Sequence, residues 1–173
     1  IFSTCYHNYN EPIVIDDLVS VLKHNNVHTE LIMDDKCCGM PKLELGDLET
    51  VEKMMLHNIQ KFKKYVDDGY KIIAPVPSCV LMFKQELPLL FPDNIDIKSI
   101  SMALHDPFEY LLKLHEQGNL KTDFTREIGS IFYQVACHQR VQNIGQVTKK
   151  ILELVPNTDV EELERCSGHE GTY

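Results

Sequence analysis

Two adjacent cysteines in residues 36–41, KCCGMP, are the part of the sequence with the most distinctive chemistry. Neighbouring cysteines make a poor disulfide, because closing the small ring distorts the peptide bond between them. Their side chains diverge, which also makes them awkward ligands for a single tetrahedral ion. A group of several metal atoms suits them better, because each thiolate can reach a different atom. The pattern therefore predicts a multi-metal target for Cys37 and Cys38.

The other cysteines repeat this arrangement along the chain. Cys5 is separated from Cys37 by 31 residues, and Cys137 is separated from Cys166 by 28. The order strand, cysteine, helix, strand, then Cys-Cys-Gly or Cys-Ser-Gly occurs in both halves, and in the first half a later strand leads to Cys79. We interpret this as an internal duplication.

Strand–helix–strand units must position these cysteines. Such units predict an α/β fold of two pseudo-repeated lobes with mainly parallel sheets and the cysteines at the carboxyl ends of strands. We expect strands near residues 1–5, 27–33, 70–79, 131–137 and 159–166. We expect helices near residues 11–26, 46–69, 80–91 (cut by Pro88), 106–118 and 144–156, from apolar residues at helical spacing.

Turn and capping residues mark several boundaries. The clearest helix is expected to begin after the N-cap Asp47 and to end at Gly69. Its stripe of apolar residues is expected to face the core. Asp106 is the expected N-cap of another helix, with Glu109 at the capping-box position. Gly39, after the cysteine pair, can take the positive φ of a sharp turn.

Composition narrows the class of protein. The chain has 173 residues, 43% of them hydrophobic, and a net charge of −9, which argues against nucleic-acid binding. No apolar run reaches the roughly 20 residues of a membrane span. The chain is not small and has enough apolar residues for a core, so the six cysteines indicate metal-bound thiolates in a reducing compartment rather than disulfides. We expect a cytoplasmic location.

The limits of the chain suggest a piece of a longer protein. Ile1 lies in an expected strand and Tyr173 directly follows a glycine-rich motif. We expect a first repeat over residues 1–117, a linker over 118–130 and the start of a second repeat over 131–173. If the duplication holds, a further strand ending in a cysteine should follow Tyr173.

The segments KCCGMPKLELGD, PVPSCVLMFKQELP, ACHQRVQNIG and ERCSGHEGTY resemble the cysteine-rich CCG domain. That domain occurs in heterodisulfide reductases and in the iron–sulfur subunits of enzymes such as anaerobic glycerol-3-phosphate dehydrogenases. The resemblance covers nearly the whole chain, as one complete repeat and the start of a second. It implies that Cys5, Cys37, Cys38 and Cys79 bind an iron–sulfur cluster.

The family's fullest pattern ends in Cys-x-x-Cys, whereas Cys79 is followed by Val80, Leu81 and Met82. Four thiolates suffice for an ordinary 4Fe–4S cluster. The resemblance implies a non-catalytic electron-transfer module of an oxidoreductase complex. Its partner would be a flavoprotein dehydrogenase subunit or a ferredoxin-type protein, and its acceptor a quinone, a disulfide or a redox protein. Peripheral association with the inner membrane would come through such partners.

A second site is expected in the second repeat. Cys137 with His138, and Cys166 with His169, give two thiols and two imidazoles, a chemically sensible set for zinc. Buried free thiols and hydrogen-bonding turn histidines are the simpler interpretation of the same residues.

Two alternatives to electron transfer stay open at this point. The chain could be a zinc-stabilised scaffold, or Cys37 and Cys38 could exchange directly with disulfides. Direct exchange would need a low thiol pKa and solvent access.

Overall fold

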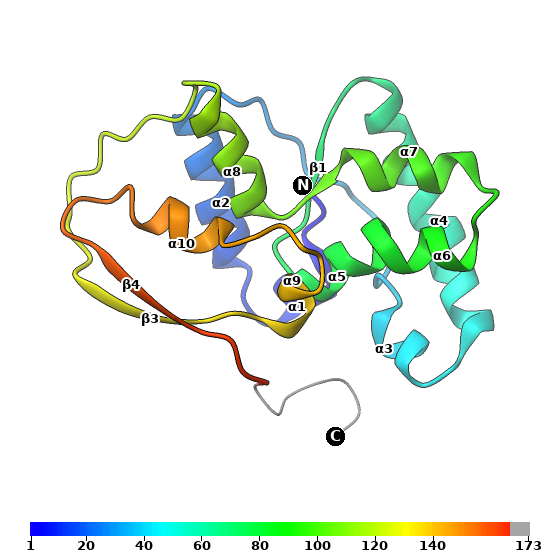
Figure 1. Cartoon of the computed structure of the whole chain (residues 1–173). Helices are drawn as coiled ribbons and strands as arrows, with labels where there is room; N and C mark the ends of the chain where they lie inside the picture. The colour runs from blue at the N-terminus through cyan, green and yellow to red at the C-terminus, as the bar shows by residue number, and fades with distance from the viewer. Residues whose placement is uncertain (167–173) are drawn as a thin grey trace.

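The computed structural model describes residues 1–166, in which helices outnumber short parallel strands (Figure 1). The helices of the first part are α1 Thr4–Tyr9, α2 Ile13–His24, α3 Met40–Glu44, α4 Leu48–Asp67, α5 Pro77–Leu81, the π-helix η1 Met82–Glu86, α6 Leu87–Leu90, α7 Ile95–Ala103 and α8 Pro107–Glu116. The remaining elements are β1 Ile72–Ile73, β2 Leu104–His105, β3 Ser130–Gln134, α9 Cys137–Arg140, α10 Val147–Leu152 and β4 Asp159–Leu163.

Helix α4 forms as its caps and periodicity predict. Asp47 accepts a hydrogen bond from the Thr50 backbone N–H at 3.2 Å, and Gly69 follows the helix with a φ of +88°. One face is buried and packs against α7 (Figure 1). Leu48, the first residue of the helix, is 52% exposed although its spacing places it in the apolar stripe.

The centre of the molecule is extended chain with little regular sheet. β1 and β2 pair in parallel, with Ile72 opposite Leu104 and Ile73 opposite His105. Residues 1–3 lie beside β1, because the Phe2 N–H donates to the Ile73 carbonyl at 2.9 Å.

The sequence predicted more and longer strands around this sheet than the structure contains, and that prediction is wrong. Residues 1–5 and 27–33 contain no assigned strand. The strand expected over residues 70–79 ends at Ile73, because Pro75 and Pro77 have no N–H to donate to a ladder.

Three aromatic rings fill the core between this centre and the helices. The ring centroids of Phe2 and Phe62 are 5.1 Å apart, those of Phe62 and Phe83 are 5.0 Å apart, and those of Phe2 and Phe83 are 5.8 Å apart. All three side chains are at most 1% exposed. The N-terminal segment, α4 and η1 are thereby packed together.

Pro88 does not cut its helix as expected. The chain runs from α5 through η1 into α6, with Pro88 inside α6. A proline ring clashes with the carbonyl four residues earlier in a regular helix. The residue four positions before Pro88 is Lys84, which belongs to η1. The wider turn of a π-helix at this residue leaves room for the proline ring.

The second half, residues 130–166, is a strand–helix–strand unit as expected. β3 and β4 pair in parallel from Ser130 opposite Asp159 to Gln134 opposite Leu163, with α9 and α10 between them in the chain. Ile151 of α10 packs into an apolar core with α2 and α8. The α/β class is thus confirmed, while the repeat and linker boundaries remain predictions.

Across residues 1–166, no helix combines the length and hydropathy needed to cross a membrane.

Candidate functional site

Cys5 lies in the first turn of α1, and not at the end of a strand. The backbone turns sharply at Thr4, whose φ is +69°, and this ends the extended segment before a strand can reach the cysteine. The Thr4 hydroxyl lies 3.3 Å from Nδ1 of His7 within the same short helix. Cys5 is left partly exposed.

Cys37 and Cys38 lie in a loop that Asn58 of α4 holds in place. The Asn58 amide oxygen accepts from the Lys36 N–H at 2.8 Å, and its Nδ2 donates to the carbonyls of Lys36 at 3.0 Å and Cys37 at 3.2 Å. Asn58 is fully buried. Sequence reasoning missed this residue, although a lone polar side chain on the buried face of α4 was a visible signal.

Gly39 turns the chain directly after the cysteine pair. Its φ of +92° lies in the region that strains residues with a side chain, as the sequence predicted. A Cβ placed on it would lie 3.6 Å from Cε of Met82, in ordinary contact with the core. The conformation of the turn, more than lack of space, therefore requires glycine.

Cys79 is the third residue of α5 and is 3% exposed. Pro77 is at the start of this helix, where its missing N–H costs no hydrogen bond. Cys79 was expected at the end of a strand. Instead, the chain leaves β1 at Ile73, passes Pro75 and enters α5 at Pro77, so Cys79 lies in a helix. Cys38 is equally buried, whereas Cys37 is partly exposed.

The four thiols form a continuous row, which we call the thiol row. Cys5 interacts with Cys37, Cys37 with Cys38, and Cys38 with Cys79. Three separate segments of the chain thus bring the predicted residues together. All are free thiols.

The thiol pKa values of Cys5, Cys37 and Cys38 are raised, so these three residues favour the neutral thiol. Burial, followed by the neighbouring Cys37, raises the pKa of Cys5 from 9.0 to about 11. The hydrogen bond to Cys38 is the main cause of a raised pKa at Cys37. For Cys38 the contact with Cys37 favours the thiolate, but the contact with Cys79 and burial together outweigh it and raise the pKa.

The chemistry of this donor set fits an iron–sulfur cluster better than one ion. Within residues 1–166, no three Cys, His, Asp or Glu side chains converge in a way that could hold a single metal ion. A 4Fe–4S cluster takes one thiolate on each of its four iron atoms, so the number and type of these donors fit such a cluster.

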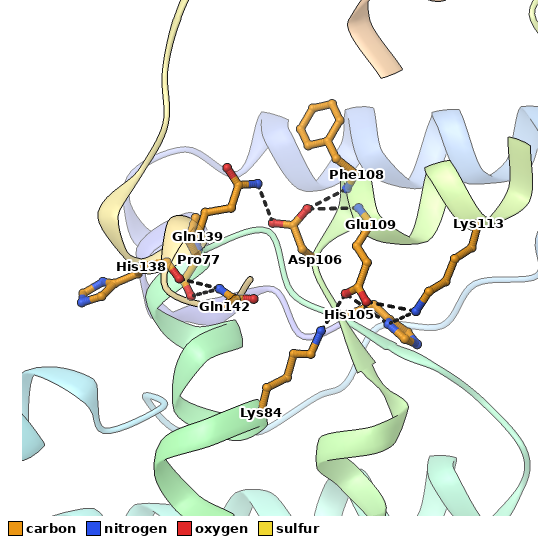
Figure 2. A network of polar contacts seen from close by, with 10 residues as sticks. All are labelled: Pro77, Lys84, His105, Asp106, Phe108, Glu109, Lys113, His138, Gln139 and Gln142. Carbon is orange, nitrogen blue, oxygen red and sulfur yellow. Dashed lines mark hydrogen bonds and ion pairs between the residues drawn. The ribbon is translucent and has the colours of Figure 1, made fainter. Parts of the chain in front are cut away.

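The candidates for the second site are placed close to the first half. Cys137 begins α9, which packs against α5, and Nε2 of Gln142 donates to the Pro77 carbonyl at 3.1 Å (Figures 1 and 2). Nε2 of His138 lies 4.0 Å from Oε1 of Glu44 in α3. Cys137 was expected at a strand end, but β3 stops at Gln134.

Cys166 is exposed, three residues after the end of β4. His169 lies outside the described residues. The zinc set of Cys137, His138, Cys166 and His169 therefore remains a prediction.

A group of polar side chains joins the two halves, and we call it the polar junction: the buried Asp106, Gln139 and Thr148, and the half-buried Tyr133. Nε2 of Gln139 donates to Oδ2 of Asp106 at 3.3 Å (Figure 2). It also donates to the Thr148 hydroxyl at 3.1 Å. The Tyr133 hydroxyl donates to the Gln139 amide oxygen. Asp106 also caps α8, accepting from the Phe108 N–H at 2.8 Å, as predicted. Burial raises the pKa of the Asp106 carboxyl.

Glu109 does not complete the expected capping box. Its carboxylate instead accepts from Lys84 at 2.8 Å and from Lys113 at 3.0 Å, and lies 3.3 Å from Nδ1 of His105 (Figure 2). Burial opposes ionisation, but hydrogen bonds from His105, Lys84 and Lys113 outweigh it and hold the pKa far below its usual range. Side-chain cations have thus replaced the local backbone partner, and the pair with Lys84, 25 residues away in the chain, ties η1 to α8.

The chain is similar to curated proteins of two kinds. A subunit of the anaerobic glycerol-3-phosphate dehydrogenase of Escherichia coli is 26% identical over 99% of this chain, which spans only 43% of that protein. Lactate utilization protein A of Oceanobacillus iheyensis and of Bacillus cytotoxicus are each 26% identical over the whole chain, which covers 71% and 72% of them. No solved structure matches. The family model of the cysteine-rich domain CCG matches residues 1–84, the part that contains the thiol row. The chain is therefore similar to the CCG cysteine-rich domain family over residues 1–84, and the resemblance read from the cysteine motifs is confirmed for that part.

Proposed function

We propose that this chain is an iron–sulfur electron-transfer module of an oxidoreductase. Cys5, Cys37, Cys38 and Cys79 would hold one 4Fe–4S cluster. The thiol row is the observation that carries the proposal: four cysteines from three segments each interact with the next thiol in the row, inside the region that matches the cysteine-rich domain. A bound cluster supplies one-electron redox chemistry that no side chain provides.

The protein's own residues position and shield the thiols. Asn58 fixes the carbonyls of Lys36 and Cys37, and Gly39 permits the turn that follows. Cys38 and Cys79 are each 3% exposed, so this side of the site excludes water. Burial and hydrogen bonding around thiolates are the usual means by which a protein sets a cluster's potential.

Ligation must overcome the raised thiol pKa values. A thiol binds metal as the thiolate, so loading the site releases protons. Their raised pKa values keep Cys37 and Cys38 of the metal-free protein as neutral thiols at pH 7, which makes them weak nucleophiles. This weighs against direct exchange of Cys37 and Cys38 with disulfides.

A dehydrogenase is the partner that the relatives' names support, since one is part of a dehydrogenase and the others serve lactate utilization. We propose that electrons come from a flavoprotein subunit or ferredoxin-type protein and leave to a quinone, a disulfide or a redox protein. A cytoplasmic site of action, with association to the inner membrane through partners, follows from the same proposal.

Metal analysis of protein purified without oxygen tests the proposal. We expect about four iron atoms and about four acid-labile sulfides per chain, with visible absorption that disappears when a chelator removes iron. Zinc in place of iron, with no sulfide, would instead support the scaffold alternative. Zinc in addition to iron would support a second site around Cys137 and His138.

A further inference from the structure

A cavity of about 300 Å³ lies at the carboxyl ends of the two parallel strands of the second half. Its wall is made by β3 and β4 on one side, and by α9, α10 and the turn between these helices on the other. Ligands of parallel α/β units gather at the carboxyl ends of strands, and a volume of this size suits one small molecule. None of the four thiols of the thiol row lines this cavity.

One face of these two strands changes from apolar to acidic along its length. Ile131 pairs with Val160, which is 1% exposed, and two residues further on Tyr133 pairs with Glu162. Side chains two positions apart on a strand share a face, so Glu162 and Glu164 stand where the pattern would place further core residues. Tyr133 and both glutamates line the cavity. Acidic residues on the inner face of a sheet break the local pattern, and such breaks are expected at functional sites.

Glu162 is the residue that selects the class of ligand. Both of its carboxylate oxygens are buried, and within residues 1–166 neither has a hydrogen-bond partner. A buried carboxylate is unfavourable unless a cation or a hydrogen-bond donor pairs with it. The polar groups beside it are already engaged, because the Tyr133 hydroxyl donates to Gln139 and Gln139 donates to Thr148. This wall therefore calls for a ligand that supplies donors and positive charge.

Other charged residues of the wall do not meet this need. Arg140 lines the cavity but is exposed, and it gives Glu162 no hydrogen bond. Glu164 is exposed as well, so water and salt screen its charge. A metal ion would lack ligands, because no three Cys, His, Asp or Glu side chains of the described chain are grouped to hold one. An organic cation brings its own donors and needs no such group.

Two features favour a guanidinium group among organic cations. Its planar fork of N–H groups can donate to two carboxylate oxygens at once, and both oxygens of Glu162 are unpartnered in the described structure. Tyr133 lies opposite Glu162 on the neighbouring strand, and its ring is held in place by the hydroxyl's hydrogen bond to Gln139. A flat cation bound to the carboxylate can stack on this ring.

We propose that this cavity binds a small guanidinium compound, with the guanidinium fork on Glu162 and against the ring of Tyr133. The inference goes beyond the electron-transfer function and does not depend on it, because none of the proposed cluster ligands lines the cavity. The Glu162 oxygens have already lost contact with water in the folded chain. Binding therefore does not have to remove water from the carboxylate, which favours a cation at this position.

The test titrates the metal-free protein with butylguanidinium and follows its amide NMR shifts. Two probes of similar length separate charge from shape: butylurea has a planar fork without the charge, and butylammonium has the charge without the fork. We expect shift changes in β3, β4 and residues 141–146, and a Kd about tenfold higher for each of the other probes. Equal binding of either probe, or no shift changes at about 10 mM butylguanidinium, would overturn the proposal.

Two neighbouring glutamates on β4 supply a matched pair of variants. Glu162→Gln keeps the size of the side chain but removes its charge, and it should raise the Kd of butylguanidinium about tenfold or more. Glu161→Gln makes the same change at the adjacent residue, which is exposed and is not part of the wall, and should leave the Kd within about twofold. Equal Kd values for the two variants would place the ligand elsewhere and reject the assignment.

Stability separates ligand binding from a structural role of Glu162. A buried carboxylate without a partner does not stabilise the ligand-free fold, so Glu162→Gln should unfold at the same urea concentration as the wild type or at a higher one. Butylguanidinium should raise the urea midpoint of the wild type but not that of Glu162→Gln. A lower midpoint for Glu162→Gln in the absence of ligand would show that Glu162 serves the fold instead.

Discussion

The two halves of this molecule share a cysteine pattern but place the cysteines differently. In the first half Cys38 and Cys79 are almost fully buried against a core built around Phe2, Phe62 and Phe83. In the second half Cys137 is partly exposed and Cys166 is exposed. In the first half the cysteine motif thus lies in a contiguous thiol row against a large core. In the described part of the second half, the motif lies beside a smaller core. A repeated motif does not imply a repeated site unless the core behind it is repeated too.

The largest expected difference between the halves concerns iron. Cys38→Ser should lose most of the iron, because Cys38 connects Cys37 with Cys79 in the row. Cys137→Ser should keep most of it. Iron and sulfide determination on both variants, purified without oxygen, measures the contrast. Equal losses would mean that α9, which packs against α5, brings Cys137 into the same centre.

Unfolding free energies should also separate the halves. Phe83→Ala removes a ring that is 1% exposed and should cost about 3–5 kcal/mol, because it leaves a cavity in the main core. Phe132→Ala, at a ring that is 63% exposed on β3, should cost no more than about 0.5 kcal/mol. Urea unfolding of the metal-free variants gives both values. Similar costs would show that the second half contributes to stability as much as the first.

Glu109 ties η1 to α8, so its loss should have an intermediate effect. Glu109→Gln should cost about 1–3 kcal/mol at pH 7, because it leaves Lys84 and His105 without their carboxylate. Glu49→Gln breaks an exposed pair with Lys53 and should cost at most about 0.5 kcal/mol.

The cost at Glu109 should depend on pH in a defined direction. Because its folded-state pKa lies below the usual 4.5, the ion pair contributes fully above that value and is lost as the pH falls below it. The difference between wild type and Glu109→Gln should therefore shrink on acidification. A difference that stays constant from pH 7 to pH 3 would contradict the ionic explanation.

The smallest effect is expected at alkaline pH in the metal-free protein. The Cys5 pKa is raised from 9.0 to about 11, so the unfolded chain ionises this thiol first and the contribution of Cys5 to stability falls between these two values. Cys5→Ser removes this contribution, so its unfolding free energy should fall less steeply with pH over that range. Thermal unfolding at pH 8.5, 9.5 and 10.5 measures the two slopes, and equal slopes would exclude Cys5 as their source.

Local signals in the sequence determined much of the fold. Asp47 and Asp106 were identified as helix caps, Gly39 as a turn with positive φ, and β3 and β4 as parallel partners, and the structure agrees. The cysteine motifs indicated the resemblance to the CCG domain, whose family model matches residues 1–84. Caps, turns and periodicity act within a few residues, and a dense motif is visible in the order of residues alone, so all of these can be read without a tertiary structure.

Tertiary structure decided the rest. Asn58 reaches the cysteine loop from 21 residues away, Glu109 pairs with Lys84 instead of capping its own helix, and Gln139 joins the two halves through Asp106. Each of these contacts links segments whose approach depends on how the apolar faces of the helices pack. The burial of Cys38 and Cys79, and the partial exposure of Cys137, follow from that packing, because burial depends on the surrounding core and not on the neighbouring residues in the chain.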